Sequence, residues 1–247
     1  MDSDLAEDGG PALDVVRFER PTRIVHWVLA APFVLLLLTG LTNFVPRLKA
    51  TQFADERLFA WAHVILGFAS VAAVVLVVLP QLASRAARAD LRAITRVSVR
   101  DYLWVQHAVL MLTGQPSRPP AVGKFNAGQK GNALLSFGAT VALLGTGLIL
   151  GVNYVSKKVF TANFVESVFP LHTWVALLFT PVLLGHLYLA LVNPSTRESL
   201  RAITRGRVRR DWAAHHHGGW LAEAHAGRAS RLQAGAEHAP PAERASR

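Results

Sequence analysis

The sequence predicts an all-α integral membrane protein built as a four-helix bundle, and three observations support that prediction. Of the 247 residues, 51% are hydrophobic and 17% are charged, whereas about a quarter of the residues are charged in typical soluble domains. Four long windows contain no Asp, Glu, Lys or Arg: Ile24–Pro46, Leu58–Ser84, Gly131–Ser156 and Ser167–Thr196. The Lys and Arg residues are concentrated in alternate segments between these windows, as membrane topology requires.

Each charge-free window predicts one membrane-spanning helix. About 20 apolar residues in a helix cross the roughly 30 Å hydrocarbon core of a bilayer, and each window is at least that long. The expected helices lie near residues 24–45, 58–80, 132–154 and 171–193. A signal peptide is not expected, because the segment 1–14 is acidic rather than basic. We therefore expect a multi-pass membrane protein.

The segments outside the four helices predict one domain with an extension at each end. Residues 15–220 are expected to form the membrane domain, 1–14 an acidic, disordered extension, and 221–247 a disordered tail. Within the domain, residues 101–113 are apolar but too few to span a bilayer, so they predict an interfacial helix. Residues 114–123 are rich in Pro and Gly and predict irregular backbone.

The basic residues predict the orientation of the chain. Of the 26 Lys and Arg residues, 21 lie in the N-terminal segment, the linker 81–130 and the C-terminal tail. With four spans these three segments share one face of the membrane, and the positive-inside rule makes that face cytoplasmic. Both termini are thus predicted to be cytoplasmic. Topology and anionic lipid account for the net charge of +10, so no nucleic-acid partner is expected.

Four histidines lie inside the charge-free windows, and these are His26, His63, His172 and His186. Apart from two tyrosines, they are the only ionisable side chains in those windows. Ionisable groups at membrane depth are costly, which makes each of them a candidate for a functional role. A neutral imidazole that hydrogen-bonds between helices is the simpler interpretation of any single one. Four imidazoles at matched depths favour a function.

The depths of the four histidines group them into two pairs. In the predicted topology His63 and His172 lie near the external side, whereas His26 and His186 lie toward the cytoplasm. His172 and His186 belong to the same predicted helix. Their spacing in the sequence separates them by about 21 Å and leaves them within roughly 40° of the same helix face. We call His63 and His172 the outer pair, and His26 and His186 the inner pair.

Two imidazole pairs at two depths are typical of haem b with two axial histidine ligands. Haem iron takes axial nitrogens from opposite sides of a planar macrocycle, so the ligands come from facing helices at one height. Gly40, Gly67 and Gly185 lie near the histidines and could make room for the macrocycle. Zinc or copper favours three or four clustered ligands, and proton relays usually contain Asp or Glu. The absence of cysteine excludes iron–sulfur clusters and covalently attached haem in this chain.

Two other histidine positions are weaker candidates. His107 lies on the predicted interfacial helix and could replace His26 as a ligand, although a surface imidazole is the simpler interpretation. His215–His217 in the tail are predicted to be exposed to solvent and not to bind metal. The two-pair arrangement does not require either of them.

The loop before the third predicted helix carries Asn126, Gly128 and Gln129. The side-chain amides of Asn126 and Gln129 can donate hydrogen bonds to a quinone carbonyl and favour the negative charge that develops on reduction. Asn126 is also a common residue at a helix N-cap. Taken alone, these residues favour a helix N-cap over a quinone site.

Three stretches of the sequence are distinctive. They are residues 17–27 (RFERPTRIVHW), 124–130 (KFNAGQK) and 193–208 (NPSTRESLRAITRGRV), the last followed by Trp212-Ala-Ala-His-His. Together they resemble the gamma subunit, a dihaem cytochrome b556-type membrane subunit, of respiratory formate dehydrogenases, over about residues 15–220. The first stretch is shared with hydrogenase and other dihaem cytochromes b, whereas the second and third are more specific to formate dehydrogenase.

This resemblance implies a four-helix dihaem cytochrome b architecture and an electron-transfer role. Position by position, it implies that the outer pair ligates the iron of an external-side haem b and the inner pair that of a cytoplasmic-side haem b. It also implies that Asn126, Gly128 and Gln129 bind quinone, either menaquinone or ubiquinone, beside the cytoplasmic haem. Electrons would enter from an iron–sulfur partner, cross both haems and reduce quinone near the cytoplasmic face, which contributes to the proton motive force.

The resemblance also implies partners and a location. An iron–sulfur (beta) subunit and a molybdopterin catalytic (alpha) subunit would complete a formate dehydrogenase in the bacterial cytoplasmic (inner) membrane, among lipid and quinone. Formate oxidation would occur on those subunits, and no catalytic residue is expected in this chain. A higher oligomer of the complex is left open. The alternatives are a cytochrome b subunit of a nickel–iron hydrogenase or similar periplasm-facing oxidoreductase and, more distantly, a haem-free membrane anchor or transporter.

Overall fold

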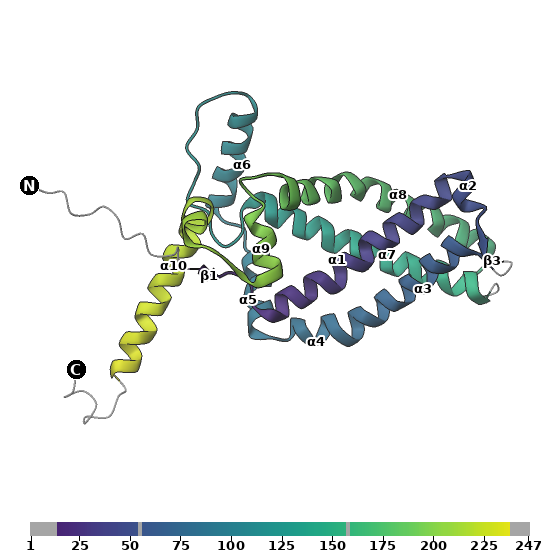
Figure 1. The fold of residues 1–247 in the computed structure, drawn as a ribbon, viewed down its shortest axis with the longest axis horizontal. Helices are drawn as coiled ribbons and strands as arrows, with labels where there is room; N and C mark the ends of the chain where they lie inside the picture. The colour runs from purple at the N-terminus through teal and green to yellow at the C-terminus, as the bar shows by residue number, and fades with distance from the viewer. Residues whose placement is uncertain (1–13, 54–55, 157–158, 238–247) are drawn as a thin grey trace, which may run out of the picture. The chain divides into compact units, whose positions relative to one another are not determined.

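The computed structural model describes residues 14–53, 56–156 and 159–237, and most of them are helical (Figure 1). In chain order the elements are β1 (Asp14–Val16), α1 (Arg20–Leu41), η1 (Thr42–Phe44), α2 (Pro46–Lys49), β2 (Gln52–Phe53), β3 (Glu56–Arg57), α3 (Leu58–Ala73), η2 (Val74–Val78), α4 (Leu79–Leu82), α5 (Arg85–Thr95), α6 (Val99–Leu112), α7 (Ala127–Ser156), α8 (Ala162–Leu187), η3 (Tyr188–Val192), α9 (Glu198–Arg205), β4 (Arg207–Arg209) and α10 (Arg210–Glu237). The short strands pair as β1 with β4 and β2 with β3.

The chain divides into two compact units. The bundle unit comprises Val16–Arg92 and Gly131–Arg207. The linker unit comprises Met1–Val15, Ala93–Lys130 and Val208–Arg247. The four histidines of the outer and inner pairs belong to the bundle unit, and the loop with Asn126 and Gln129 belongs to the linker unit.

Among the residues that the structure describes, four continuous helices are long and apolar enough to cross a membrane, as the four charge-free windows predicted. They cover Arg20–Phe44, Leu58–Leu82, Ala127–Ser156 and Ala162–Val192. Two of them pass through a π-helical turn, α3 through η2 into α4, and α8 into η3. Among the boundaries of the four spans, the start of α8 differs most from the prediction. The helix begins at Ala162 and not near residue 171, because Pro170 lies inside it. A proline removes one backbone hydrogen bond, and long apolar helices tolerate that loss.

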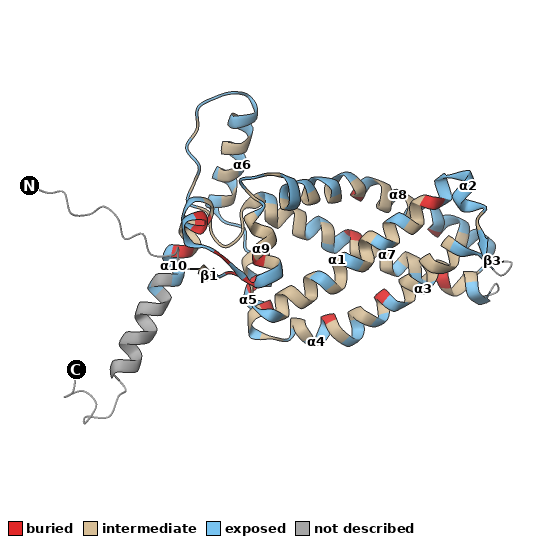
Figure 2. Ribbon diagram, in the orientation of Figure 1, coloured by how far each residue is buried: buried red, intermediate tan, exposed pale blue. Residues whose placement is uncertain are grey.

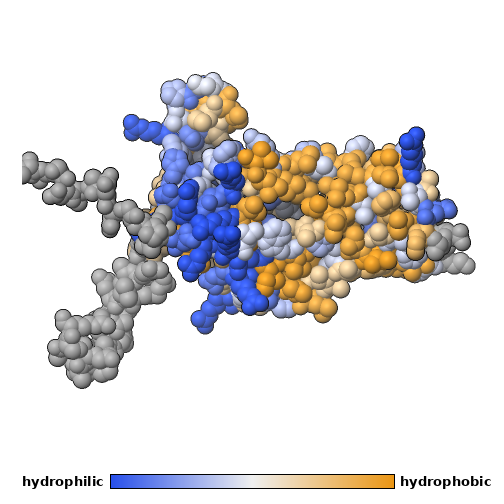
Figure 3. Space-filling model, viewed as in Figure 1, coloured by the Kyte–Doolittle hydropathy of each residue, from blue (hydrophilic) through white to orange (hydrophobic). Residues whose placement is uncertain are grey.

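The surface of these helices is apolar, as a lipid-facing surface is. In the most hydropathic window of each candidate span, at most 11% of the residues are buried. Large side chains such as Leu76, Leu178 and Phe137 are 73%, 71% and 69% exposed. Figure 2 shows that residues along α1, α3, α7 and α8 are mostly intermediate or exposed, and Figure 3 shows hydrophobic residues over these helices and hydrophilic ones around α9. An apolar surface of this extent marks a membrane protein.

Aromatic pairs and close helix contacts hold the bundle unit together. Phe33 of α1 meets Phe179 of α8, with the ring centroids 5.4 Å apart and the rings nearly perpendicular. At Gly151 of α7, an added Cβ would lie 3.3 Å from the ring of Phe68 of α3. Small residues let membrane helices approach this closely, because lipid offers no hydrophobic drive for their association.

The start of α1 is tied to the end of α9 inside the bundle unit. The backbone N–H groups of Arg17 and Phe18 donate to the carbonyl oxygen of Gly206 at 2.8 and 3.2 Å. Arg23 donates to the carbonyl oxygen of Thr204 at 2.7 Å. Gly206 has φ +83°, and an added Cβ would lie 2.7 Å from the carbonyl oxygen of Phe18, so only glycine fits. Burial of Arg17 lowers its pKa to about 10 although Asp90 acts to raise it, and the side chain keeps its charge at neutral pH.

The linker unit contains the helix expected over residues 101–113, which is α6. Ser98 and Asp101 form a capping box at its start: the Ser98 N–H donates to the Asp101 carboxylate at 2.8 Å and the Ser98 hydroxyl donates to it at 2.9 Å. This cap explains why the helix begins at Val99. Residues 115–123 have no regular structure, as their Pro and Gly content indicated.

Whereas the sequence predicts a disordered tail from residue 221, helix α10 runs from Arg210 to Glu237. A kink at His217, with φ −142° and ψ 41°, divides it. The expectation rested on low hydrophobicity, but the segment is rich in Ala, the residue with the highest helix propensity. Residues 1–13 and 238–247, which were also expected to be disordered, lie outside the described residues.

Candidate functional site

The outer pair consists of one histidine from each of two helices of the bundle unit. His63 lies on α3 and His172 lies on α8. Their ring centroids are 6.1 Å apart and the ring planes are 88° apart. The structure therefore brings together two residues that lie far apart in the sequence.

The inner pair has a similar separation. His26 lies on α1 and His186 lies on α8, with ring centroids 6.3 Å apart and planes inclined by 58°. Helix α8 thus contributes one histidine to each pair. The interval between His172 and His186 corresponds to a rise of about 21 Å along α8.

The separation within each pair fits a metal ion held between two imidazoles. A metal–imidazole nitrogen bond is about 2.0 Å and the nitrogen lies about 1.1 Å from its ring centroid, so two rings on opposite sides of one ion have centroids about 6.2 Å apart. The measured values are 6.1 and 6.3 Å. Within the described residues there is no cluster of three or more His, Cys, Asp or Glu side chains, so imidazole pairs are the metal-binding arrangement that they offer.

Two threonine hydroxyls contact the rings of the outer pair. Thr39 Oγ1 of α1 lies 3.0 Å from His63 Nδ1, and Thr146 Oγ1 of α7 lies 2.8 Å from His172 Nδ1. Because the hydroxyls engage Nδ1 in both rings, Nε2 is the nitrogen that remains for a metal. Metal-binding histidines usually have their second ring nitrogen hydrogen-bonded in this way.

A glycine follows each of these threonines and lies against the same ring. A Cβ added at Gly40 would be 3.3 Å from His63 Cε1, and one added at Gly147 would be 3.2 Å from His172 Cε1. A Cβ at either position would require the imidazole to move by a few tenths of an ångström, and a longer side chain would compete with the ring for its space. An added Cβ at Gly67 or Gly185 would meet nothing within 4 Å, so neither glycine contacts a histidine ring. The small residues at Gly40 and Gly147 are the ones that make room for the rings.

The inner pair has a different neighbour. Asn132 Nδ2 of α7 lies 3.5 Å from His186 Nδ1, which is a long contact. Trp27, next to His26, donates from Nε1 to the carbonyl oxygen of Ile203 at 3.1 Å and holds that end of α1 to α9. The two pairs therefore share their ring separation but differ in the groups that orient the rings.

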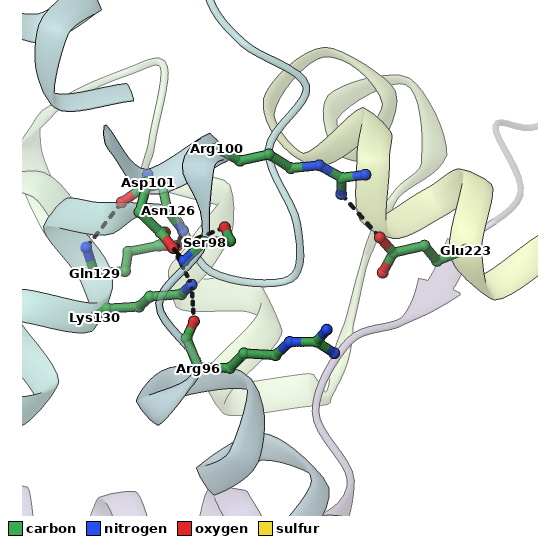
Figure 4. A network of polar contacts seen from close by, with 8 residues as sticks. All are labelled: Arg96, Ser98, Arg100, Asp101, Asn126, Gln129, Lys130 and Glu223. Atoms are coloured by element: carbon green, nitrogen blue, oxygen red, sulfur yellow. Dashed lines mark hydrogen bonds and ion pairs between the residues drawn. The ribbon is translucent and has the colours of Figure 1, made fainter. Parts of the chain in front are cut away.

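In the linker unit, Asn126 and Gln129 cap α7 reciprocally. The Asn126 N–H donates to Gln129 Oε1 at 3.1 Å, and the Gln129 N–H donates to Asn126 Oδ1 at 2.8 Å (Figure 4). These bonds form the helix N-cap that the sequence favoured for this loop. Both bonds use amide oxygens and leave the two NH₂ groups out of the cap. At Gly128 an added Cβ would lie 2.8 Å from the Trp104 ring, so this glycine permits close packing against α6.

A lysine–aspartate pair joins the start of α7 to the cap of α6. Lys130 Nζ donates to Asp101 Oδ2 and to the carbonyl oxygen of Arg96, each at 2.8 Å (Figure 4). The Lys130 and Asp101 side chains are 13% and 12% exposed. Although burial acts to raise the pKa of Asp101, the bonds from Lys130 and Ser98 hold it below its usual value, so the carboxylate is ionised at neutral pH. The charge of Lys130 is therefore balanced within the unit.

The remaining histidine candidates lie in the linker unit. His107 Nδ1 is 2.8 Å from the Ser117 hydroxyl. His217 is 2% exposed and its Nδ1 is 2.9 Å from the carbonyl oxygen of Gly123, and His216 is half-buried and stacks on Trp212. The prediction that His215–His217 are all exposed is therefore wrong for these two. Gly218 and Gly219, which follow the kink at His217, were a local signal of a break in the helix.

Sequence reasoning missed Thr39, Asn132, Thr146 and Gly147. A signal was present, because the dipeptide Thr-Gly occurs in two of the predicted spans, at 39–40 and at 146–147. Its meaning depends on which histidine lies opposite, and only the helix packing shows that.

Comparison with known proteins points to one group. A family model described as prokaryotic cytochrome b561 matches residues 17–206. The cytochrome b556(Fdn) subunit of nitrate-inducible formate dehydrogenase from Escherichia coli K12 is 27% identical over 211 residues, which are 85% of this chain and 91% of the relative. The formate dehydrogenase cytochrome b556 subunit of Haemophilus influenzae is 29% identical over 215 residues, 85% of this chain and 83% of the relative. The cytochrome b556(fdo) subunit of E. coli K12 is 24% identical over 211 residues, which are 85% of this chain and 92% of the relative.

Proposed function

Since the chain belongs to the prokaryotic cytochrome b561 family, we propose that it is the membrane cytochrome b subunit of a formate dehydrogenase complex. Membership of a cytochrome b family implies haem b. The formate dehydrogenase assignment is supported by relatives with that name, which match 85% of this chain. The four membrane-crossing helices fit a subunit that works within the bilayer.

The single observation that carries the proposal is the presence of two imidazole pairs with metal-bridging separations. The outer pair holds one haem b and the inner pair holds the other, each through Nε2 of its histidines. Two bound haems supply one-electron carriers at two depths between an iron–sulfur donor and a quinone. The protein positions them: α8 provides a ligand at each depth, and α1 and α3 each provide one facing ligand.

The apolar helices also exclude water from the ligands. No Asp, Glu, Lys or Arg lies in the windows that contain the four histidines, so each ligand is in a low-dielectric setting. In such a setting a neutral imidazole is favoured over its charged form, and a neutral imidazole is the form that binds iron. The bundle unit thus keeps its histidines ready for a metal without a competing carboxylate.

The start of α7 is the proposed quinone site. The cap consumes the amide oxygens of Asn126 and Gln129 and orients both side chains, so that their NH₂ groups can donate to a quinone carbonyl. Gly128 lets the Trp104 ring pack against this turn, which helps to hold the cap in place beside the proposed site. Hydrogen-bond donors placed in advance favour the charge that develops on the carbonyl oxygen during reduction. Placed at the cytoplasmic face, the site takes its protons from the cytoplasm and contributes to the proton motive force.

The chain needs partners for the rest of the reaction. It has no cysteine and so cannot bind an iron–sulfur cluster, and in the proposal an iron–sulfur subunit and a molybdopterin subunit provide the donor and oxidise formate. The proposed location is the inner membrane of a bacterium, with both termini in the cytoplasm.

The proposal is tested on the chain purified from membranes with its partners. We expect a b-type α band and a Soret band that sharpen on reduction, and a haemochrome assay that gives two haems b per chain. Formate should reduce both haems, and added quinone should reoxidise them. A purified chain without Soret absorbance would disprove the proposal. Haems that are reduced by hydrogen and not by formate would assign the chain to a hydrogenase.

Replacing Gln129 with Glu tests the quinone site without removing the cap. A glutamate keeps the oxygen that accepts from the Asn126 N–H, but it lacks the NH₂ donor. We expect quinone reduction to slow by about tenfold, the value of one hydrogen bond of about 1.4 kcal/mol, with both haem spectra unchanged. The control is Gln129→Ala, which removes the donor and the cap together. A wild-type quinone rate in Gln129→Glu would leave the loop with its capping role alone.

A further inference from the structure

The hydroxyls of Thr39 and Thr146 each donate their proton to a backbone carbonyl of their own helix. Thr39 Oγ1 lies 2.9 Å from the carbonyl oxygen of Leu35 and 3.1 Å from that of Leu36, one turn back in α1. Thr146 Oγ1 lies 2.6 Å from the carbonyl oxygen of Ala142 in α7. A hydroxyl has one proton, and a threonine inside a helix usually gives it to such a carbonyl. Each threonine oxygen therefore faces its imidazole as an acceptor.

An acceptor at Nδ1 determines where each imidazole carries its proton. A neutral imidazole has one N–H and one lone pair, and the hydrogen bond made by one nitrogen decides the state of the other. In His63, Nδ1 lies 3.0 Å from the threonine oxygen, and in His172 it lies 2.8 Å from it. His63 also interacts with the carbonyl oxygen of Leu36, so Thr146→Val is a sharper test than Thr39→Val. With only acceptors at Nδ1, the lone pair lies on Nε2. That is the tautomer that can bind iron through Nε2.

The arrangement occurs twice around the outer pair. In both cases a threonine of one helix bonds Nδ1 of a histidine on another helix, and the glycine after it lies 3.2–3.3 Å from Cε1 of the same ring, measured from an added Cβ. The hydroxyl fixes the position of Nδ1, and the glycine leaves room for the ring beside it. In this arrangement the two ring planes are 88° apart.

The inner pair lacks these threonine contacts. His186 Nδ1 has the 3.5 Å contact to Asn132, and in the described part of the chain His26 has no hydroxyl within hydrogen-bond distance. The sequence spacing of Asn132 and Thr146 on α7 equals that of His186 and His172 on α8, so one helix contacts both α8 histidines with different chemistry. The two sites therefore differ in the electron density that reaches the ligand nitrogen.

We propose that Thr39 and Thr146 are positioning residues for the outer haem, acting through the outer pair to set its reduction potential. This inference rests on the proposed function. A ligand histidine whose second nitrogen donates to an acceptor is more basic and stabilises ferric over ferrous iron. The threonines thus hold the potential of the outer haem below the value that it would have without them. They also hold the angle between the ligand planes.

The test replaces each threonine with valine, which has the same shape and no hydroxyl, and with serine, which keeps the hydroxyl. In the complete complex we expect Thr39→Val and Thr146→Val to raise the midpoint potential of the same haem. The expected size is a three- to tenfold change in the ferric-to-ferrous ratio at fixed potential, where tenfold corresponds to about 59 mV. The ferric EPR signal of that haem should shift as well, because its anisotropy depends on the ligand planes. Serine should restore both values.

The matched control is Thr180→Val. Thr180 also donates to a carbonyl one turn back, that of Ala176 at 2.8 Å, and among the described residues it has no histidine partner. The midpoint potentials of both haems in Thr180→Val should equal those of the wild type. A valine variant that loses one haem, which serine restores, also supports the inference.

Three results would overturn the inference. They are unchanged potentials and EPR in both valine variants, an equal shift in Thr180→Val, or a loss of haem that serine does not restore. Absence of haem from the wild type is a separate outcome, which disproves the proposed function itself.

Discussion

Replacing His186 with Ala is expected to remove one of two b haems from the complex and leave the other in place. The pairing explains this, because His186 meets His26, whereas the outer pair is made by other residues. Without an axial ligand from α8, haem affinity at the inner site should fall by more than about a hundredfold, since even outer-shell partners of a ligand are worth tenfold to a hundredfold. Haemochrome quantification should give one haem per chain. Quinone reduction should stop, while the donor still reduces the remaining haem.

His107→Ala is the matched control for that experiment. His107 contacts the Ser117 hydroxyl at 2.8 Å and belongs to neither pair. This variant should keep two haems and wild-type quinone reduction, whereas loss of a haem would favour His107 as a ligand in place of His26. If His186→Ala loses both haems or neither, the assignment of ligands to two separate sites is wrong.

Replacing Gly147 with Leu is expected to remove the outer haem by displacing a ligand that is itself unchanged. An added Cβ at this position already lies 3.2 Å from His172 Cε1, and the longer leucine side chain needs the space of the ring. Overpacking of this kind costs about 1–3 kcal/mol, which weakens haem binding about fivefold to a hundredfold. A redox titration should show the loss of one component and an unchanged potential for the other.

Gly145→Leu controls for the introduction of a leucine into α7. Gly145 lies close to Gly147 in the same helix, and an added Cβ there would meet nothing within 4 Å. We expect two haems in this variant. If both variants behave alike, then steric access to His172 is not the cause. If Gly147→Leu keeps both haems at wild-type potentials, the ring of His172 does not need the position it has in the structure.

The helices could be predicted from the sequence because a bilayer imposes a simple rule. Long stretches without charge must be helical, since no other open structure satisfies the backbone in hydrocarbon. The exact ends of the helices were harder to predict. The fourth span begins at Ala162 and not at 171, because Glu166 and Pro170 interrupt the apolar pattern but not the helix. In the tail, low hydrophobicity indicated disorder, whereas residues 221–237 belong to the Ala-rich helix α10.

The histidines of the candidate site could also be found from the sequence. An ionisable group inside a charge-free window stands out, and the direction of each helix with its constant rise per residue assigns each histidine a depth. The groups around them could be noticed but not assigned in this way. Threonine and glycine are common in membrane helices, so Gly40 and the Thr-Gly dipeptides at 39–40 and 146–147 do not show by themselves which histidine they contact.

By itself, then, the sequence determined the number of spans and the candidate ligands, because hydrophobicity and charge act on each segment separately. The tertiary structure alone decided which threonine hydroxyl faces which imidazole and which glycine leaves room for a ring. Those contacts join α1 with α3 and α7 with α8, and the two hydrogen bonds are 3.0 and 2.8 Å long. They depend on the rotation of each helix about its axis, and that rotation is set by the packing of all the helices together.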